Sequence, residues 1–157
     1  MNILQIGDKA PGFTLFSTDK QQVSLSDYHG KKVLLIFFPF AFSGTCTKEM
    51  CLLRDGLSGY INLKVDILAL SVDSPYTLAK FKEFNNLGFT FLSDFNKTVS
   101  KAYGCLKEEF SMELLGVAKR SAFVIDEEST IKYIEILENA DDLPNFEAIN
   151  TILLSLN

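Results

Sequence analysis

The chain has 157 residues, the length of one typical domain. Apolar residues make up 47% and charged residues 22%, so the composition excludes a disordered or collagen-like chain. Fifteen basic residues against twenty acidic ones give a formal charge of −5, which argues against a nucleic-acid or anionic-membrane surface. We therefore expect a single domain over residues 1–157, with no nucleic acid and no membrane among its partners.

The lack of a recognisable export signal and the number of cysteines predict a reducing compartment. The longest apolar run, residues 33–38, is too short to cross a bilayer, and the first eight residues lack the basic and apolar regions of a secretory signal. We therefore expect a cytoplasmic protein whose three cysteines begin as thiols, since an odd number cannot all pair within the chain. No metal site is expected, because His29 is the only histidine and the cysteines form no Cys-x-x-Cys pair.

The first part of the chain predicts three strands and a helix. Residues 13–16 and 23–25 read as short strands on either side of a polar turn, and the apolar run at 33–38 predicts a strand buried on both faces. Pro39 ends that run. A helix beginning near Cys46 and ending around Gly56 and Gly59 is then predicted by apolar residues spaced four, three and four apart: Cys46, Met50, Leu53 and Leu57.

The middle of the chain repeats this alternation of strand and helix. Residues 65–72 predict a second buried strand, and Ser74 followed by Pro75 marks a helix start. The apolar stripe of that helix is Leu78, Phe81 and Phe84, and Gly88 is its stop. Residues 89–92 predict a further strand.

The last part of the chain predicts a hairpin between two helices. Asp94 is expected to cap a short helix that ends near Gly104. Residues 121–125 and 130–137 then predict a hairpin. Asp142 and Pro144 open a final helix whose apolar face is Phe146, Ile149, Leu153 and Leu156. Strands interleaved with helices, closed by a hairpin, predict an α/β fold with a mixed sheet and helices on both faces.

The candidate chemistry lies in residues 39–51, with the sequence PFAFSGTCTKEMC. A loop carries the chain from the end of a buried strand to a helix that begins near Cys46, the usual location of a site in an α/β sheet. Free N–H groups and the helix dipole stabilise a thiolate at such a position. The position alone leaves a second interpretation open, in which Cys46 is a small buried side chain of the core.

The spacing Pro39-x-x-x-Ser43-x-x-Cys46 resembles the peroxidatic motif Pro-x-x-x-(Thr/Ser)-x-x-Cys of the peroxiredoxins, and Glu49 follows three residues later. Three further segments are similar to peroxiredoxin sequence: GDKAPGFTL at 7–15, AYG at 102–104 and KRSAFVID at 119–126. The resemblance covers almost the whole chain. It implies a thioredoxin-like fold with a central mixed β-sheet flanked by helices.

The resemblance also implies roles for particular residues. Cys46 is implied as the peroxidatic thiolate, and Arg120 as the neighbour that keeps the sulfur ionised and binds the peroxide. Ser43 and the N–H of Cys46 would complete a polar cradle for the charge that develops on the peroxide oxygens. Pro39 would shield the sulfur from water, and Glu49 would orient Arg120. Taken alone, Arg120 reads as a solvated charge and Glu49 as a first-turn carboxylate favoured by the helix dipole.

Cys51 resembles the resolving cysteine of the Q-type peroxiredoxins, also called bacterioferritin-comigratory proteins, which lies five residues after the peroxidatic one. The resemblance therefore implies a redox-active Cys46–Cys51 disulfide. An intact helix holds such Cα atoms about 8–9 Å apart, whereas a disulfide needs less than about 7 Å, so the helix must unwind. The FAFSGTC loop is closer to the one-cysteine alkyl-hydroperoxide-reductase-E group, in which Cys51 would be an idle thiol. Cys105 is interpreted as structural, with a resolving role as its alternative.

The function implied by the resemblance is a thiol peroxidase for hydrogen peroxide and organic hydroperoxides, recycled by a thioredoxin-like dithiol protein. No metal, flavin or haem cofactor is implied. Three alternatives stay open: a one-cysteine peroxiredoxin reduced by an external thiol, a thioredoxin-type disulfide carrier, and a non-peroxidatic redox sensor. The disulfide carrier would need a Cys-x-x-Cys at the helix start, which this chain lacks. The sequence leaves open whether the protein is a monomer or a homodimer. It also leaves open whether Phe40 and Phe42 line the entrance for organic hydroperoxides, form a dimer contact or pack in the core.

Overall fold

The computed structural model describes residues 3–157; residues 1 and 2, part of the stretch assessed above for an export signal, lie outside this description. The strands are β1 (Thr14–Ser17), β2 (Gln22–Ser24), β3 (Lys32–Phe37), β4 (Val65–Ser71), β5 (Thr90–Ser93), β6 (Leu106–Glu109), β7 (Leu115–Ala118), β8 (Ser121–Ile125) and β9 (Ile131–Ile136). The α-helices are α1 (Gly44–Asp55), α2 (Leu57–Asn62), α3 (Pro75–Phe84), α4 (Thr98–Ala102) and α5 (Phe146–Ser155). Two short 3-10 helices are η1 (Leu25–Tyr28) and η2 (Ser111–Glu113).

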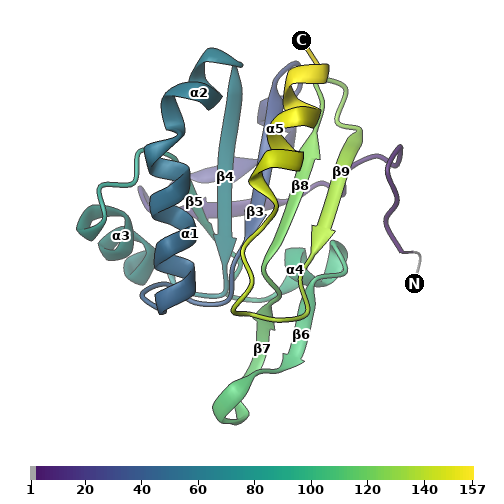
Figure 1. Ribbon diagram of the computed structural model, residues 1–157. Coiled ribbons are helices and arrows are strands. Elements are labelled where there is room, and N and C mark those ends of the chain that lie inside the picture. The colour runs from purple at the N-terminus through teal and green to yellow at the C-terminus, as the bar shows by residue number, and fades with distance from the viewer. Residues whose placement is uncertain (1–2) are drawn as a thin grey trace.

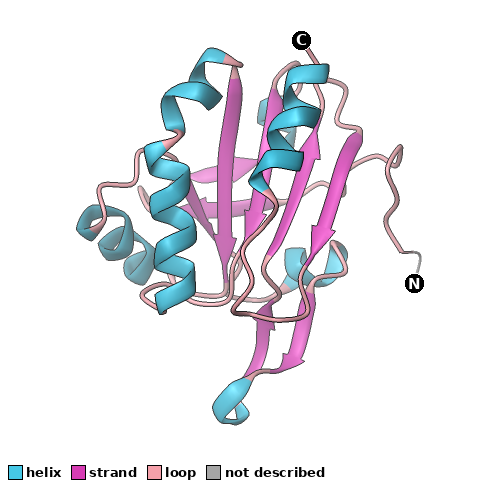
Figure 2. Cartoon of the chain, in the orientation of Figure 1, coloured by secondary structure: helices cyan, strands magenta, loops and turns pink. Residues whose placement is uncertain are grey.

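Seven strands form one mixed sheet in the order β2-β1-β5-β4-β3-β8-β9 (Figures 1 and 2). The central strands β3, β4 and β5 are parallel, and β8 runs antiparallel to β3. Every residue of β3 is buried, because helices cover the sheet on both faces. The predicted α/β architecture is therefore confirmed.

Each face of the sheet has its own apolar core. On one face α1, α2, α3 and α5 pack against the side chains of β3, β4 and β8 that point toward them. On the other face η1, α4 and the segment around Cys105 pack against the alternate side chains of the same strands. The period of two along each strand sends successive side chains to opposite faces, so one apolar run supplies both cores.

Several local predictions are confirmed by the structure. Ser74 is the N-cap of α3 and accepts a hydrogen bond from the N–H of Thr77 at 3.2 Å. Asp94 accepts from the N–H groups of Val99 and Ser100, in the first turn of α4. The hairpin of β8 and β9 is present, and α5 buries its predicted apolar face.

Other predictions need correction. α1 begins at Gly44, because Ser43 has the extended backbone of an N-cap, so Cys46 lies inside the first turn of the helix. Gly59 lies within α2 and does not end α1. Phe84 is 78% exposed and belongs to no core, so only Leu78 and Phe81 of the predicted stripe are buried.

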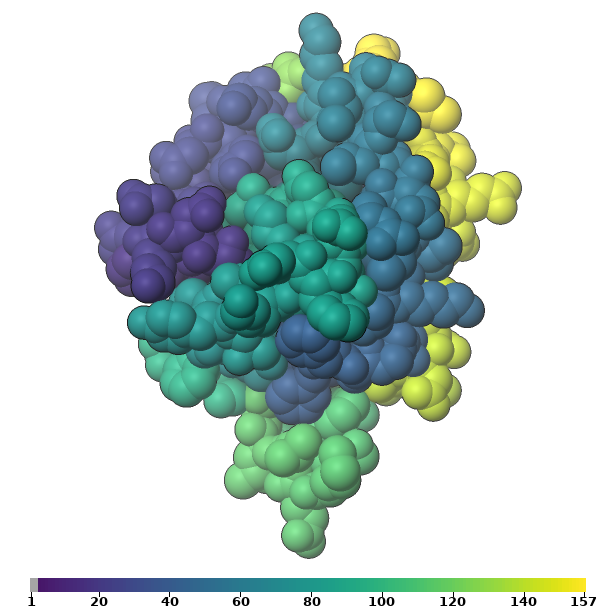
Figure 3. Space-filling view, turned by 90° about the vertical axis from the view of Figure 1, so that its left-hand side faces the viewer, coloured from purple at the N-terminus to yellow at the C-terminus, as the bar shows by residue number. Residues whose placement is uncertain are grey.

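The hairpin of β6 and β7 was not predicted. It pairs only with itself and projects beyond the main sheet, as Figures 1 and 3 show. Its strands are four residues each, and Gly116 interrupts the apolar character of β7, so no run of strand-forming residues stands out. Over residues 3–157, no helix is both long and apolar enough to cross a membrane.

Candidate active site

The site is assembled where β3 ends and α1 begins. Pro39 follows the strand, and a short loop leads to Ser43, whose carbonyl accepts from the N–H of Thr47 at 2.9 Å. Thr47 is the first residue of α1 whose N–H can reach an acceptor within the helix. The N–H groups of Gly44, Thr45 and Cys46 therefore have no acceptor within the helix. Cys46 therefore lies at the positive end of the helix dipole.

Arg120 reaches the site from its position just before β8, the strand that pairs with β3. Phe37 of β3 pairs with Ser121 of β8, which places Arg120 beside the point where the chain leaves β3 for the loop. Its Nη2 donates to the Sγ of Cys46 at 3.3 Å, and its Nη1 donates to Oε1 of Glu49 at 3.2 Å. The structure therefore brings Cys46, Arg120 and Glu49 into one contact network across 74 residues of sequence.

This network is removed from water. Cys46 and Glu49 are fully buried and Arg120 is 1% exposed, which corrects the plain interpretation of Arg120 as a solvated charge. Glu49 lies beyond the first turn of α1, so the plain interpretation of a first-turn carboxylate is wrong as well. Burial raises the pKa of Glu49 to about 8, and the positive charge of Arg120 limits that rise. Oε2 of Glu49 and Nε of Arg120 are buried without a hydrogen-bond partner. Glu49 can therefore hold or release a proton near neutral pH, directly beside the arginine that contacts the sulfur.

A hollow of about 330 Å³ opens onto this network. Its wall includes Pro39, Ser43, Arg120 and the aromatic rings of Phe40 and Phe110, which lie 5.7 Å apart edge to face. The hydroxyl of Ser43 donates to the carbonyl of Phe40 at 3.0 Å, and does not cap a helix N–H. The expected Pro39 and Ser43 thus both border the hollow, with the Ser43 hydroxyl turned toward the loop.

The three cysteines are free thiols. Cys51 is partly buried within the intact α1, one and a half turns beyond Cys46, so the two cysteines are not bonded. Cys105 is fully buried on the opposite face of the sheet, where burial raises the pKa of its thiol to about 12. A group of three or more His, Cys, Asp or Glu side chains able to hold a metal ion does not occur in residues 3–157.

Two contacts of the site, made by Ala140 and Phe110, could not be predicted from any pattern in the sequence. The carbonyl of Ala140 accepts from Nη2 of Arg120 at 2.8 Å. Ala140 lies in the connection from β9 to α5, which crosses the same edge of the sheet as the start of the β6–β7 hairpin (Figure 1). Phe110, from that hairpin, packs on Phe40. Both are placed by loops, so neither belongs to a periodic pattern.

A thiol that accepts a hydrogen bond from a guanidinium, at a helix start in an α/β sheet, is set up for redox chemistry at sulfur. Fold and site together define the class of thiol-dependent oxidoreductases with a thioredoxin-like sheet.

Comparison with known proteins identifies the family. The model of the AhpC/TSA family matches residues 6–134, and Peroxiredoxin Bcp of Escherichia coli is 37% identical over 135 residues, 85% of this chain and 86% of that protein. The crystal structure of Peroxidoxin BcpB from Mycobacterium tuberculosis has a TM-score of 0.82 at 26% identity, over 98% of this chain and 96% of the other. The chain belongs to the AhpC/TSA family and is a peroxiredoxin enzyme.

The relatives also support the predicted subgroup, because the matches in Escherichia coli and Mycobacterium tuberculosis both carry Bcp names. A cysteine-to-serine mutant of PrxQ from Xylella fastidiosa superimposes with a TM-score of 0.87, covering 100% of both chains at 21% identity. That likeness shows the fold alone, and it confirms the predicted thioredoxin-like architecture.

Proposed function

We propose that this protein reduces hydrogen peroxide and organic hydroperoxides through the sulfur of Cys46. The observation that carries the proposal is the buried contact of 3.3 Å between Nη2 of Arg120 and Sγ of Cys46. A guanidinium beside the sulfur favours the thiolate over the thiol, and the thiolate is the nucleophile. Other donors of Arg120 are held by Glu49 and Ala140, so the guanidinium keeps one orientation.

The first step oxidises Cys46. The thiolate attacks one oxygen of the hydroperoxide, a sulfur–oxygen bond forms, and the oxygen–oxygen bond breaks. Cys46 becomes a sulfenic acid, and the leaving oxygen takes a proton to become water or an alcohol. Negative charge grows on both oxygens as their bond lengthens. Arg120 and the Cys46 N–H are the donors proposed to stabilise that charge. The Ser43 hydroxyl is proposed to join them by turning from the Phe40 carbonyl toward the peroxide. Pro39, which borders the hollow, is proposed to shield the sulfur from water.

The second step joins Cys46 to Cys51. The Cys51 thiol attacks the sulfenic sulfur, a disulfide forms, and water leaves with the hydroxyl oxygen of the sulfenic acid. Because α1 is an intact helix, its first turns must unwind before the sulfurs meet.

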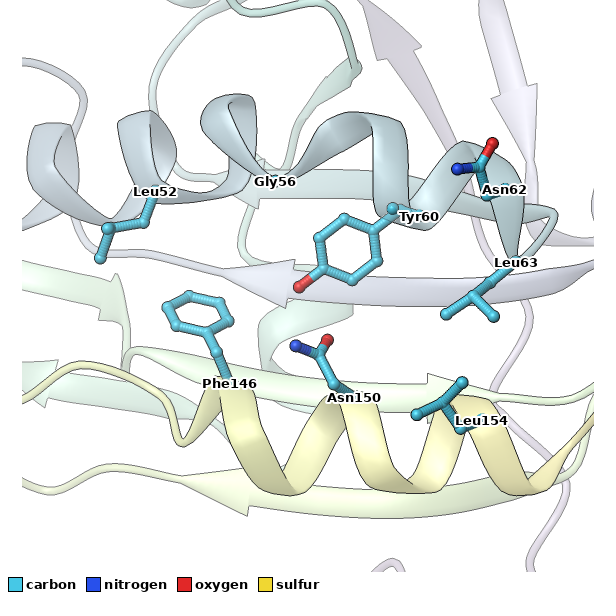
Figure 4. A pocket seen from close by; sticks show the side chains of 9 residues that line it. Leu52, Gly56, Tyr60, Asn62, Leu63, Phe146, Asn150 and Leu154 are labelled. Carbon is cyan, nitrogen blue, oxygen red and sulfur yellow. The ribbon is translucent and has the colours of Figure 1, made fainter.

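Leu52 is 44% exposed and borders a hollow of about 510 Å³ between the helices. Figure 4 shows this hollow between the α1–α2 segment and α5. It is lined by Leu52, Gly56, Gly59, Tyr60, Asn62, Leu63, Phe146, Asn150 and Leu154. The hollow borders the last turn of α1 and leaves that end of the helix room to move.

A thioredoxin-like dithiol protein is proposed to complete the cycle. Two electrons from its thiols reduce the Cys46–Cys51 disulfide, and its own thiols become a disulfide. We propose that residues 1–157 act as one domain in this cycle, as a monomer or homodimer.

The test follows the redox state of each cysteine. Reduced protein receives one equivalent of hydrogen peroxide, is quenched with an alkylating reagent, and is mapped by peptide mass spectrometry. The wild type should form the Cys46–Cys51 disulfide, Cys46→Ser should consume no peroxide, and Cys51→Ser should stop at the sulfenic acid. Cys105→Ser is the matched control and should behave as the wild type. Peroxide consumption by Cys46→Ser would refute the assignment of Cys46, whereas a lasting sulfenic acid in the wild type would make this a one-cysteine enzyme.

A further inference from the structure

The loop that precedes α1 is tied to a neighbouring strand by one carboxylate. This loop, residues 38–43, is called the Cys46 loop below. At its centre the N–H of Ala41 donates to Oδ2 of Asp73 at 2.7 Å. Asp73 follows β4, the strand that lies beside β3 in the sheet. It lies outside the motif of Pro39, Ser43 and Cys46.

Asp73 is itself held by two further strand ends. The hydroxyl of Ser71, the last residue of β4, donates to the same Oδ2 at 2.6 Å. The hydroxyl of Ser93, the last residue of β5, donates to the backbone carbonyl of Asp73 at 2.6 Å. Asp73 is therefore held in place by the ends of β4 and β5. The Cys46 loop is the part that would move if the contact between Ala41 and Asp73 broke.

The Cys46 loop needs such a fixed point because its backbone is strained. Phe42 has φ of +69°, in the left-handed region that a residue with a bulky side chain rarely adopts. Its ring packs edge to face on Phe81 at 5.2 Å and on Phe84 at 6.2 Å, both from α3. One charged hydrogen bond and two aromatic contacts thus oppose the strain, and losing any of them favours release of the loop.

We propose that Asp73 is a positioning residue for the reaction at Cys46. Its carboxylate holds Ala41 so that the Cys46 loop keeps the first turn of α1 folded, with the Cys46 sulfur against Arg120. The same bond opens when α1 unwinds to join Cys46 to Cys51. This inference rests on the proposed function, and it gives Asp73 opposite effects on the two steps: it speeds the reaction with peroxide and restrains formation of the disulfide.

The test measures both steps separately in Asp73→Ala and Asp73→Asn. The chain contains no tryptophan, so quenched flow with alkylation and mass spectrometry follows each cysteine. Asp73→Ala should slow oxidation of Cys46 about tenfold, equivalent to about 1.4 kcal/mol, and should speed the conversion of sulfenic acid to disulfide. Asp73→Asn should stay within about threefold of the wild type, because the amide oxygen can accept from both Ala41 and Ser71. Asp66→Ala, at the other end of β4, is the matched control.

Three results would overturn the role of Asp73. They are oxidation of Asp73→Ala at the wild-type rate, an equal loss in Asp73→Ala and Asp73→Asn, and an unchanged or slower conversion of sulfenic acid to disulfide in Asp73→Ala. If the wild type itself left Cys46 unoxidised, the proposed function would fail instead.

Amide exchange in the wild type tests the inference without any variant, which covers the case that Asp73→Ala does not fold. The Ala41 N–H should exchange at least about tenfold faster in the disulfide form than in the reduced form. Equal exchange in the two forms would refute the role of Asp73.

Discussion

Replacing Arg120 by methionine should expose how strongly the buried network depends on one charge. The side chain donates to Cys46, to Glu49 and to the carbonyl of Ala140, and it is 1% exposed. Methionine keeps much of the apolar volume but none of these donors. Removing one partner from a buried ion pair costs about 3–5 kcal/mol of stability, because the other group stays buried without compensation.

The size of this loss should depend on pH through Glu49. Its pKa is about 8 in the folded protein, above its ordinary value of 4.5, so stability from this group is present below 4.5 and is lost as pH rises toward 8. The charge and the hydrogen bond of Arg120 both lower that pKa. Without them the folded pKa rises further and the loss of stability extends to higher pH. We expect Arg120→Met to cost about 2–3 kcal/mol at pH 6 and about 3–5 kcal/mol at pH 9.

Urea unfolding at pH 6 and pH 9 measures this difference, in a Cys46→Ser background so that no thiolate at that position contributes. Glu49→Gln completes a double-mutant cycle, since glutamine stays neutral at every pH. The double variant should recover most of the loss seen at pH 9. With Cys46 intact, Arg120→Met should react with peroxide about 100- to 1,000-fold more slowly, the usual loss for one donor to a developing charge. This account of the network would be refuted if Arg120→Met lost the same free energy of unfolding at both pH values and Glu49→Gln recovered none of that loss.

Two further predictions concern Cys105 and the start of α3. Burial raises the pKa of Cys105 to about 12, so iodoacetamide at pH 8 should label it at least about 100-fold more slowly than Cys51 in the reduced protein. Peptide mass spectrometry measures both rates, and rapid labelling of Cys105 would contradict its burial. Ser74→Ala should lower the free energy of unfolding by about 1 kcal/mol, because the hydroxyl accepts from the N–H of Thr77. Ser74→Asp should keep that stability in the same urea titration, and an unchanged Ser74→Ala would show that the cap contributes nothing.

The sequence by itself determined the features that depend on near neighbours. The apolar run at 33–38 predicts β3, Ser74 and Pro75 predict the start of α3, and the period of α5 predicts its buried face. Pro39, Ser43 and Cys46 lie within eight residues, so the resemblance of their spacing to the peroxiredoxin motif could indicate a reactive thiol where a strand passes into a helix. These features are readable because periodicity and capping act over a few residues.

Only the tertiary structure decided what surrounds the Cys46 sulfur. The pairing of β3 with β8 brings Arg120 across 74 residues to the thiol, and the turn after β9 brings Ala140 to Arg120. Glu49 reads in sequence as an ordinary first-turn carboxylate, yet it is fully buried because the residue before β8 supplies a guanidinium beside it. Phe84 continues a helical stripe but is exposed, and its ring meets Phe42 of the loop before α1 and not the core. Burial and partner choice depend on segments far apart in the chain, and no local pattern encodes them.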